Sequence, residues 1–167
     1  FLLPLTLILQ AQRISKPDLK ILSQKEDSLK IHAYKLIQGI NASDRIKADS
    51  NFTRIFVRAL STKNSFFYPF DSLFTISKLY SPDSTFRIFT WQMVINENTI
   101  RQHGALQIKT TDGTLKLFPL IDKSDVTKNM DDTVGNNFGW MGAVYYNIIL
   151  TKHLNRSYYT LLGFDEN

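Results

Sequence analysis

The chain has 167 residues, 43% of them hydrophobic and 21% charged, and it contains no cysteine. This length can form one domain with a buried core, and the composition is that of a folded globular protein. Without cysteine there are no disulfides, thiolate metal sites or thiol nucleophiles. The formal net charge of +5 raises the question of a nucleic-acid partner, which depends on how the cations are arranged.

Residues 1–9 form an apolar run, and polar residues follow it from Gln10 onward. The run is too short to cross a bilayer, which takes ~20 apolar residues. A short apolar segment followed by a small residue, here Ala11, is typical of a secretory signal, and a buried N-terminal helix or strand is the alternative. We therefore expect residues 1–11 to be a signal-peptide remnant, with no transmembrane span and a periplasmic, secreted or cell-surface location.

Two helices are the next predicted elements. In residues 15–38 apolar side chains recur at steps of three and four, which predicts a helix with one buried face. Pro17 suits its first turn and Gly39 its end, whereas Glu26 interrupts the apolar stripe. The stripe consists of Leu19, Leu22, Leu29, Ala33, Leu36 and Ile40. A second amphipathic helix is expected over residues 43–62, antiparallel to the first.

The helical segment as a whole is predicted to cover residues 12–82. Near its end, aromatic side chains crowd around Pro69, and we expect a short helix at residues 71–79 that bridges the two halves of the chain. From residue 86 onward the pattern changes to strands, with one expected at 86–95 and another at 99–109.

The dipeptide Asp-Gly at residues 112–113 predicts a two-residue hairpin turn. This turn places Ile108 opposite Leu117, with both side chains on the core face. A shift of one residue would put Lys116 opposite Ile108 and mix the two faces, which a half-buried sheet does not tolerate. We therefore expect the first register, although Phe118 then falls on the solvent side without a reason.

The last two strands are predicted at residues 140–150 and 158–164, joined by a loop at 151–157. The first of them is apolar on both faces, which is typical of a central strand covered on both sides. Together these elements predict an α+β fold in which an N-terminal helical pair is followed by an antiparallel β-meander. Residues 83–167 would form the β-sheet region, in one folding unit with the helical segment, and the sheet would be incomplete at the C-terminus.

Aromatic side chains on the predicted strands are the candidate ligand-binding residues. They are Trp91, Trp140, Tyr145 and Tyr158. Their rings offer large apolar faces with a polar tip, which suit a glycan or a segment of an envelope protein. Packing in the core is nevertheless the favoured interpretation for most of the aromatic residues on the strands. Both tyrosines have a tyrosine neighbour whose side chain points to the opposite face of the strand, so one of each pair is expected to be exposed.

The oxygen-rich segment at residues 122–137 is the candidate ligand loop. Its carboxylates could coordinate calcium, but the alternating spacing of a calcium-binding helical hand is absent, and Lys123 and Lys128 offset their charge. A mobile loop is therefore the favoured interpretation, and a calcium site is the alternative. The four candidate ligands are Asp122, Asp125, Asp131 and Asp132. No cofactor is expected.

Neither zinc nor nucleic acid is expected as a partner. The histidines, His32, His103 and His153, have none of the spacings of a zinc site. The helix lysines recur every five residues from Lys20 to Lys35. Each step of five turns by ~140° around a helix, so these lysines do not form a stripe for a polyanion.

Two segments resemble a pattern in a family of uncharacterised exported bacterial proteins. They are residues 140–146, Trp-Met-Gly-Ala-Val-Tyr-Tyr, and residues 158–165, Tyr-Tyr-Thr-Leu-Leu-Gly-Phe-Asp. Proteins of that family are roughly twice this size, with further strands after the second segment. The resemblance implies export and an N-terminal fragment of a longer chain, and it implies no activity.

These observations favour an exported, non-catalytic domain whose sheet serves binding or envelope structure. The alternative is the N-terminal part of an exported hydrolase whose catalytic residues lie mostly beyond residue 167. An exposed Trp91 or Trp140 beside a shallow groove would favour binding. A deep cleft that joins one of the last two histidines to the carboxylates at 131–132 or to Asp165 would favour catalysis.

Overall fold

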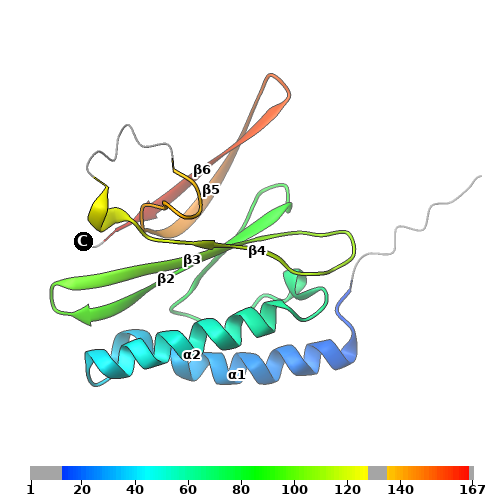
Figure 1. The fold of residues 1–167 in the computed structure, drawn as a ribbon. Coiled ribbons are helices and arrows are strands. Elements are labelled where there is room, and N and C mark those ends of the chain that lie inside the picture. The colour runs from blue at the N-terminus through cyan, green and yellow to red at the C-terminus, as the bar shows by residue number, and fades with distance from the viewer. Residues whose placement is uncertain (1–12, 128–134, 166–167) are drawn as a thin grey trace, which may run out of the picture.

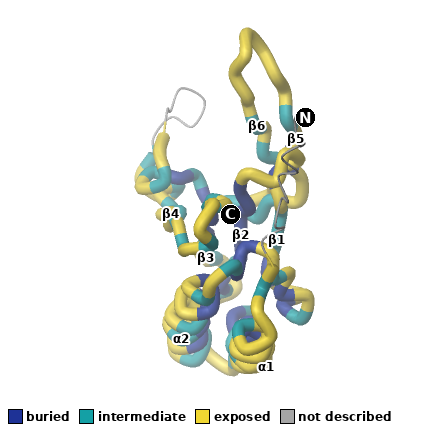
Figure 2. Tube along the Cα trace, turned by 90° about the vertical axis from the view of Figure 1, so that its right-hand side faces the viewer, coloured by how far each residue is buried: buried dark blue, intermediate teal, exposed yellow. Residues whose placement is uncertain are grey.

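The computed structural model describes residues 13–127 and 135–165, and it arranges two helices, a four-stranded sheet and a β-hairpin in three layers (Figures 1 and 2). The helices α1 (Lys16–Gln38) and α2 (Ala42–Leu60) cover one face of the sheet. The hairpin lies over the other face. The predicted α+β fold with an N-terminal helical pair is therefore confirmed, although the strands form two sheets. Among the described residues no helix combines the length and apolar character that crossing a membrane requires.

Side chains at both N-termini explain where the helices begin. The Ser15 hydroxyl accepts a hydrogen bond from the Asp18 N–H (3.2 Å), and the Asn41 side-chain oxygen accepts one from the Asp44 N–H (3.0 Å). These bonds satisfy N–H groups that have no partner within the first turn. Gly39 follows the last residue of α1, as predicted.

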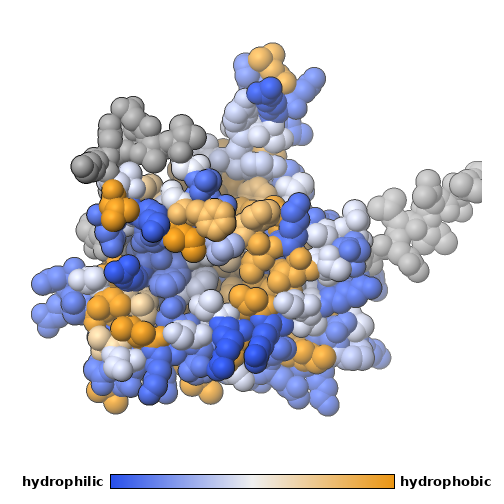
Figure 3. All heavy atoms as spheres, in the orientation of Figure 1, coloured by the Kyte–Doolittle hydropathy of each residue, from blue (hydrophilic) through white to orange (hydrophobic). Residues whose placement is uncertain are grey.

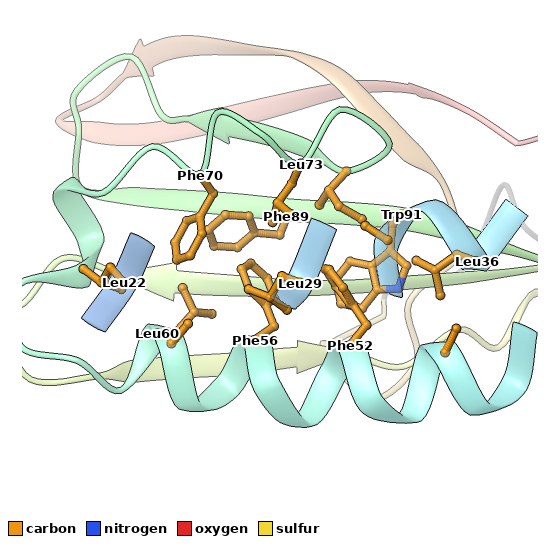
Figure 4. Close-up of a cluster of buried hydrophobic side chains, with 14 residues drawn as sticks. Leu22, Leu29, Leu36, Phe52, Phe56, Leu60, Phe70, Leu73, Phe89 and Trp91 are labelled. Atoms are coloured by element: carbon orange, nitrogen blue, oxygen red, sulfur yellow. The ribbon is translucent and has the colours of Figure 1, made fainter. Parts of the chain in front are cut away.

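The main core lies between the helices and the four-stranded sheet (Figure 4). The strands of this sheet are β1 (Ser77–Tyr80), β2 (Phe86–Asn96), β3 (Thr99–Ile108) and β4 (Lys116–Leu120), antiparallel and in the order β1-β2-β3-β4. Phe56 lies at the centre of the core, edge-on to Phe89 with ring centroids 4.8 Å apart. The buried members are Leu22, Leu29, Ala33, Leu36, Ala48, Phe52, Phe56, Ala59, Leu60, Phe70, Leu73, Ile76, Phe89 and Trp91. Fully burying one such large side chain contributes about 1.5–3 kcal/mol.

The predicted apolar stripe of α1 is correct in its middle and wrong at its ends. Leu19 and Ile40 are exposed, whereas Glu26, which interrupts the stripe, is buried. The Glu26 carboxylate accepts hydrogen bonds from the Tyr68 hydroxyl (2.5 Å) and the Ser72 N–H (2.7 Å). Burial, together with the bond to this carboxylate, raises the pKa of Tyr68 well above its usual range. Because the carboxylate has these hydrogen-bond partners, it can lie in the core. The same bonds connect the loop that contains Tyr68 and Ser72 to α1.

The short helix predicted at residues 71–79 is wrong, because β1 occupies the end of this segment. The chain turns at Phe70, whose φ is 56°. The segment then bonds to α1, since the Thr75 hydroxyl donates to the Ala33 carbonyl at 3.2 Å. β1 pairs with β2 along its whole length.

The register predicted for the hairpin at residues 112–113 is wrong by one residue. Ile108 pairs with Lys116, and Gln107 pairs with Leu117. Leu117 packs toward the helices, whereas Ile108 packs toward the β-hairpin on the opposite face. The prediction assumed that one face of the sheet is wet. Because both faces are covered, the alternation of side chains does not separate core from solvent.

Arg87 explains how Gln107 can occupy the helix-facing side of the sheet. Arg87 is 1% exposed, and its guanidinium donates to Gln107 Oε1 (2.8 Å) and to the Tyr80 hydroxyl (3.0 Å). It also donates to the carbonyls of Tyr68 (2.6 Å) and Ser65 (2.8 Å), next to or within the 3-10 turn η1 (Ser65–Phe67). The rings that flank the guanidinium are Phe66, Phe70, Tyr80 and Phe89. Burial lowers the pKa of Arg87 to about 10, so it remains charged at neutral pH.

The hairpin consists of β5 (Val144–His153) and β6 (Arg156–Phe164). Its base packs on the outer face of the four-stranded sheet, and its far end projects into solvent (Figures 1 and 2). The residues buried between the hairpin base and the sheet are Phe86 and Ile88 of β2 and Ile148 of β5. The central strand predicted at 140–150 is therefore wrong, because β5 pairs with β6 alone. The loop predicted at 151–157 is also wrong, since only Leu154 and Asn155 separate the strands.

Candidate functional site

A pocket of about 440 Å³ lies on the outer face of the four-stranded sheet, beside the base of the hairpin. This volume is within the ~300–1,000 Å³ of small-molecule sites. Hydrophobic atoms gather on this side of the molecule, around β4 and the hairpin base (Figure 3). The lining residues are Leu106, Phe118, Leu120, Gly135, Asn136, Asn137, Gly139, Trp140, Met141 and Tyr145. None of these described residues carries a charge.

Trp140 is held in the pocket wall by both its backbone and its side chain. Its N–H donates to the Ile121 carbonyl (2.9 Å), and its carbonyl accepts a hydrogen bond from the Lys123 N–H (2.8 Å). Together these two bonds form a parallel β-bridge between Trp140 and Asp122. The indole N–H donates to the Tyr145 hydroxyl at 2.7 Å. Trp140 is 8% exposed, so only a small part of its ring borders the pocket.

Tyr145 is fixed against the sheet at the start of β5. Its N–H donates to the Thr90 hydroxyl (3.0 Å), and its carbonyl accepts a hydrogen bond from the Ser77 hydroxyl. Burial raises the pKa of Tyr145, so its hydroxyl is neutral. Gly163 lies opposite on β6, where a Cβ atom would stand 2.7 Å from Tyr145 Cδ1. A residue without a side chain is therefore needed for the Tyr145 ring to lie as it does.

Gly142 brings the segment between Trp140 and Tyr145 close to the sheet. A Cβ atom at this position would lie 2.6 Å from Asp122 Oδ2 and 2.6 Å from Gln102 Cβ. The Gly142 N–H donates to Asp122 Oδ1 at 3.1 Å. Gly142 and Gly163 are thus both points of close approach next to the pocket.

Two asparagines form the polar part of the lining. The Asn137 amide donates to the Pro119 carbonyl (3.1 Å), and the Asn136 side-chain oxygen accepts from the Phe138 N–H (2.8 Å). These bonds fix the turn that precedes Trp140. Because an amide has both donor and acceptor sites, these side chains can also bond to hydroxyl groups of a ligand.

The other two predicted ligand-binding residues lie away from this pocket. Trp91 is 3% exposed; its indole N–H donates to Asp49 Oδ1 (3.3 Å), and its ring stacks on His103 at 5.8 Å. This side chain packs in the core and offers no open face to a ligand. Tyr158 is exposed on the outer part of the hairpin. The structure therefore brings together Trp140 and Tyr145 and separates Trp91 and Tyr158 from them.

The candidate calcium ligands have structural partners where they are described. Asp122 accepts hydrogen bonds from the first residue of the 3-10 turn η2 (Ser124–Val126), and Asp125 forms an ion pair with an arginine of β3 at 3.7 Å. Asp131 and Asp132 lie outside the described residues. Within residues 13–127 and 135–165, no three His, Asp or Glu side chains are placed to hold a metal ion together.

The histidines lie in three different places, and none of them lines the pocket. His103 Nδ1 is 3.8 Å from Asp49 Oδ1, between the sheet and α2. His153 is at the tip of the hairpin, and His32 is on α1, where burial and the nearby Lys35 lower its pKa.

The wall of the pocket opposite Trp140 was not predicted from the sequence. Phe118 and Leu120 lie on the outer face together with Leu106. Leu106 and Phe118 are partners across the β3–β4 pair. One signal pointed to this arrangement: the expected register left Phe118 on the solvent side. The correct register removes that anomaly, because Phe118 then faces the pocket.

Comparisons of this chain with protein-family models, with curated proteins and with solved structures give no match.

Proposed function

We propose that this chain is an exported, non-catalytic binding domain that holds an uncharged glycan in the pocket between Phe118 and Trp140. One observation carries this proposal: the described lining combines aromatic and aliphatic walls with two side-chain amides and has no charge. A charged ligand would lose its hydration there without gaining an ionic partner among the described lining residues.

The chemistry of a sugar fits this lining. A sugar ring has C–H faces that pack on aromatic rings, and hydroxyl groups that need donors and acceptors. Phe118, Trp140 and Tyr145 supply ring surface, and Asn136 and Asn137 supply amides. An apolar peptide side chain would use the rings but leave the remaining donor and acceptor sites of the two amides unused.

The wall is already organised before a ligand binds. Trp140 is bonded to Tyr145, and Tyr145 is bonded to β1 and β2. Ordering costs on binding are therefore small, which favours affinity. Because the Tyr145 hydroxyl accepts the indole N–H, its own proton can be donated to a ligand oxygen.

Export is part of the same proposal. It is supported by the apolar run at residues 1–9, the lack of cysteine and the resemblance of residues 140–146 and 158–165 to exported proteins. A glycan-binding domain of the envelope is consistent with all three.

The test is a panel of immobilised neutral oligosaccharides probed with the 167-residue chain. Phe118 is 38% exposed, so Phe118→Ala removes a pocket wall with little loss of core packing. The matched control is Phe74→Ala, at an exposed phenylalanine that does not line the pocket. We expect Phe118→Ala to raise Kd about tenfold, equal to about 1.4 kcal/mol, and the control to leave it unchanged. Equal binding by both variants, or no binding to any neutral oligosaccharide, would overturn the proposal.

A further inference from the structure

The tip of the β5–β6 hairpin presents an apolar residue between cations. Leu154 is 83% exposed at the apex. With Lys152, His153 and Arg156 it lines a concavity of about 440 Å³. Hydrophobic atoms cap the end of the hairpin, with hydrophilic atoms directly behind them (Figure 3).

The turn itself does not account for this leucine. Leu154 has a φ of 46° and Asn155 a φ of 61°, so both residues are in the left-handed region. Two-residue turns of this kind favour asparagine and glycine, and a leucine there is disfavoured by its side chain. A contact outside the chain would explain why a large apolar side chain is held at the apex.

The charge of the hairpin is positive and is concentrated at this end. Between Val144 and Phe164 there are two formal positive charges and no carboxylate. Asp83 does contact the hairpin, through the Tyr159 hydroxyl at 2.6 Å, but Tyr159 belongs to the face that packs on Phe86.

The outer face of the hairpin continues the pattern of the tip. His153 pairs with Arg156, and Thr151 pairs with Tyr158, so these four side chains share the face that points away from the sheet. Tyrosine is enriched where an apolar phase meets water, because its ring is apolar and its hydroxyl is not. The tip therefore combines the three kinds of residue that bind a charged lipid surface: a leucine, a tyrosine and cations.

We propose that the hairpin tip docks on an anionic lipid surface. Leu154 enters the boundary of the acyl chains, Tyr158 lies at the level of the headgroups, and Lys152, His153 and Arg156 contact lipid phosphates. A polyanion in water would engage the cations but would leave Leu154 exposed, so the leucine favours a lipid. This surface is at the opposite end of β5 from Tyr145, and the inference does not depend on the pocket.

The experiment is sedimentation of the 167-residue chain with vesicles of phosphatidylcholine and phosphatidylglycerol, and with vesicles of phosphatidylcholine alone. Each Lys or Arg near an anionic surface raises the partition coefficient of the protein onto the vesicles about fivefold. The double variant Lys152→Ala/Arg156→Ala therefore weakens binding about thirtyfold. Leu154→Asn suits the left-handed turn and weakens binding about tenfold, because the apolar contact is lost. The control, Lys20→Ala/Lys30→Ala, removes two exposed cations from α1 and leaves binding close to that of the unchanged chain.

The results that would overturn the inference are distinct. They are no binding to the anionic vesicles, or equal losses in the two double variants, which would show an effect of net charge alone. Retention of the chain by a soluble polyphosphate but not by vesicles would assign the tip to a polyanion. A dimer in sedimentation that Leu154→Asn dissociates would assign it to a second copy of the chain.

Discussion

Arg87→Lys keeps a positive charge in the core but removes the planar arrangement of donors. The arginine has four acceptors, which are Gln107 Oε1, the Tyr80 hydroxyl and the carbonyls of Tyr68 and Ser65. An ammonium group cannot reach all of them, and we expect it to keep two. Two buried or partly buried acceptors then lose their donor, at about 1–2 kcal/mol each, so the free energy of unfolding falls by about 2–4 kcal/mol.

The assay is urea unfolding followed by tryptophan fluorescence, since Trp91 and Trp140 are both buried. Arg54→Lys is the control, because Arg54 is exposed on α2 and bonds to a single side chain there. We expect it to change stability by less than about 0.5 kcal/mol. A loss below about 1 kcal/mol for Arg87→Lys would refute the view that its hydrogen bonds join the sheet to the segment at η1.

Three further changes have defined outcomes. The bond from Tyr159 lowers the pKa of Asp83, so Asp83 stabilises the fold above the unfolded-state pKa of about 3.9 and loses that effect as the pH falls. Tyr159→Phe should raise this pKa in a carboxyl NMR titration, and an unchanged value would contradict the assignment. Gly113→Ala should cost about 1–3 kcal/mol in urea unfolding, because φ is 75° and the new Cβ would lie 2.0 Å from Asn64 Oδ1. Leu154→Asn should stabilise the chain by about 0.5–1 kcal/mol by relieving the turn, and a loss of stability would show that the turn is unstrained.

The helices could be predicted from sequence because their determinants are local. The apolar spacing of α1, the proline in its first turn and Gly39 at its end all lie within the helix or next to it. The exposure of Leu19, in the first turns of α1, and of Ile40, which lies beyond its end, could not be predicted from the apolar spacing alone. The partners of Glu26 likewise come from a distant loop.

The strand errors have a common physical cause. Alternation of side chains reports a buried face only when the other face is wet, and the four-stranded sheet is covered on both. This is why Gln107 can face the helices and Ile108 the hairpin. β5 is apolar on both faces for a different reason. One face packs on the four-stranded sheet at the base of the hairpin, and the other face remains exposed.

Only part of the candidate site could be predicted for a similar reason. Trp91 and Trp140 both fall on predicted strands, and nothing local distinguishes a core ring from one in a pocket wall. The difference is set by α2, which covers Trp91 through Asp49, and by Tyr145, which holds Trp140. The amides at 136 and 137 become part of the lining only because the chain turns back beside β4.

The most direct test of the pocket uses the indole N–H signals of the two tryptophans in a proton–nitrogen NMR spectrum. The chain has two such signals, one from the core and one from the pocket wall. When a neutral oligosaccharide from the panel is added, we predict that the Trp140 signal shifts in a saturable way and that the Trp91 signal stays in place. A saturated complex in which Trp140 does not move, or in which Trp91 moves instead, would contradict a binding site between Phe118 and Trp140.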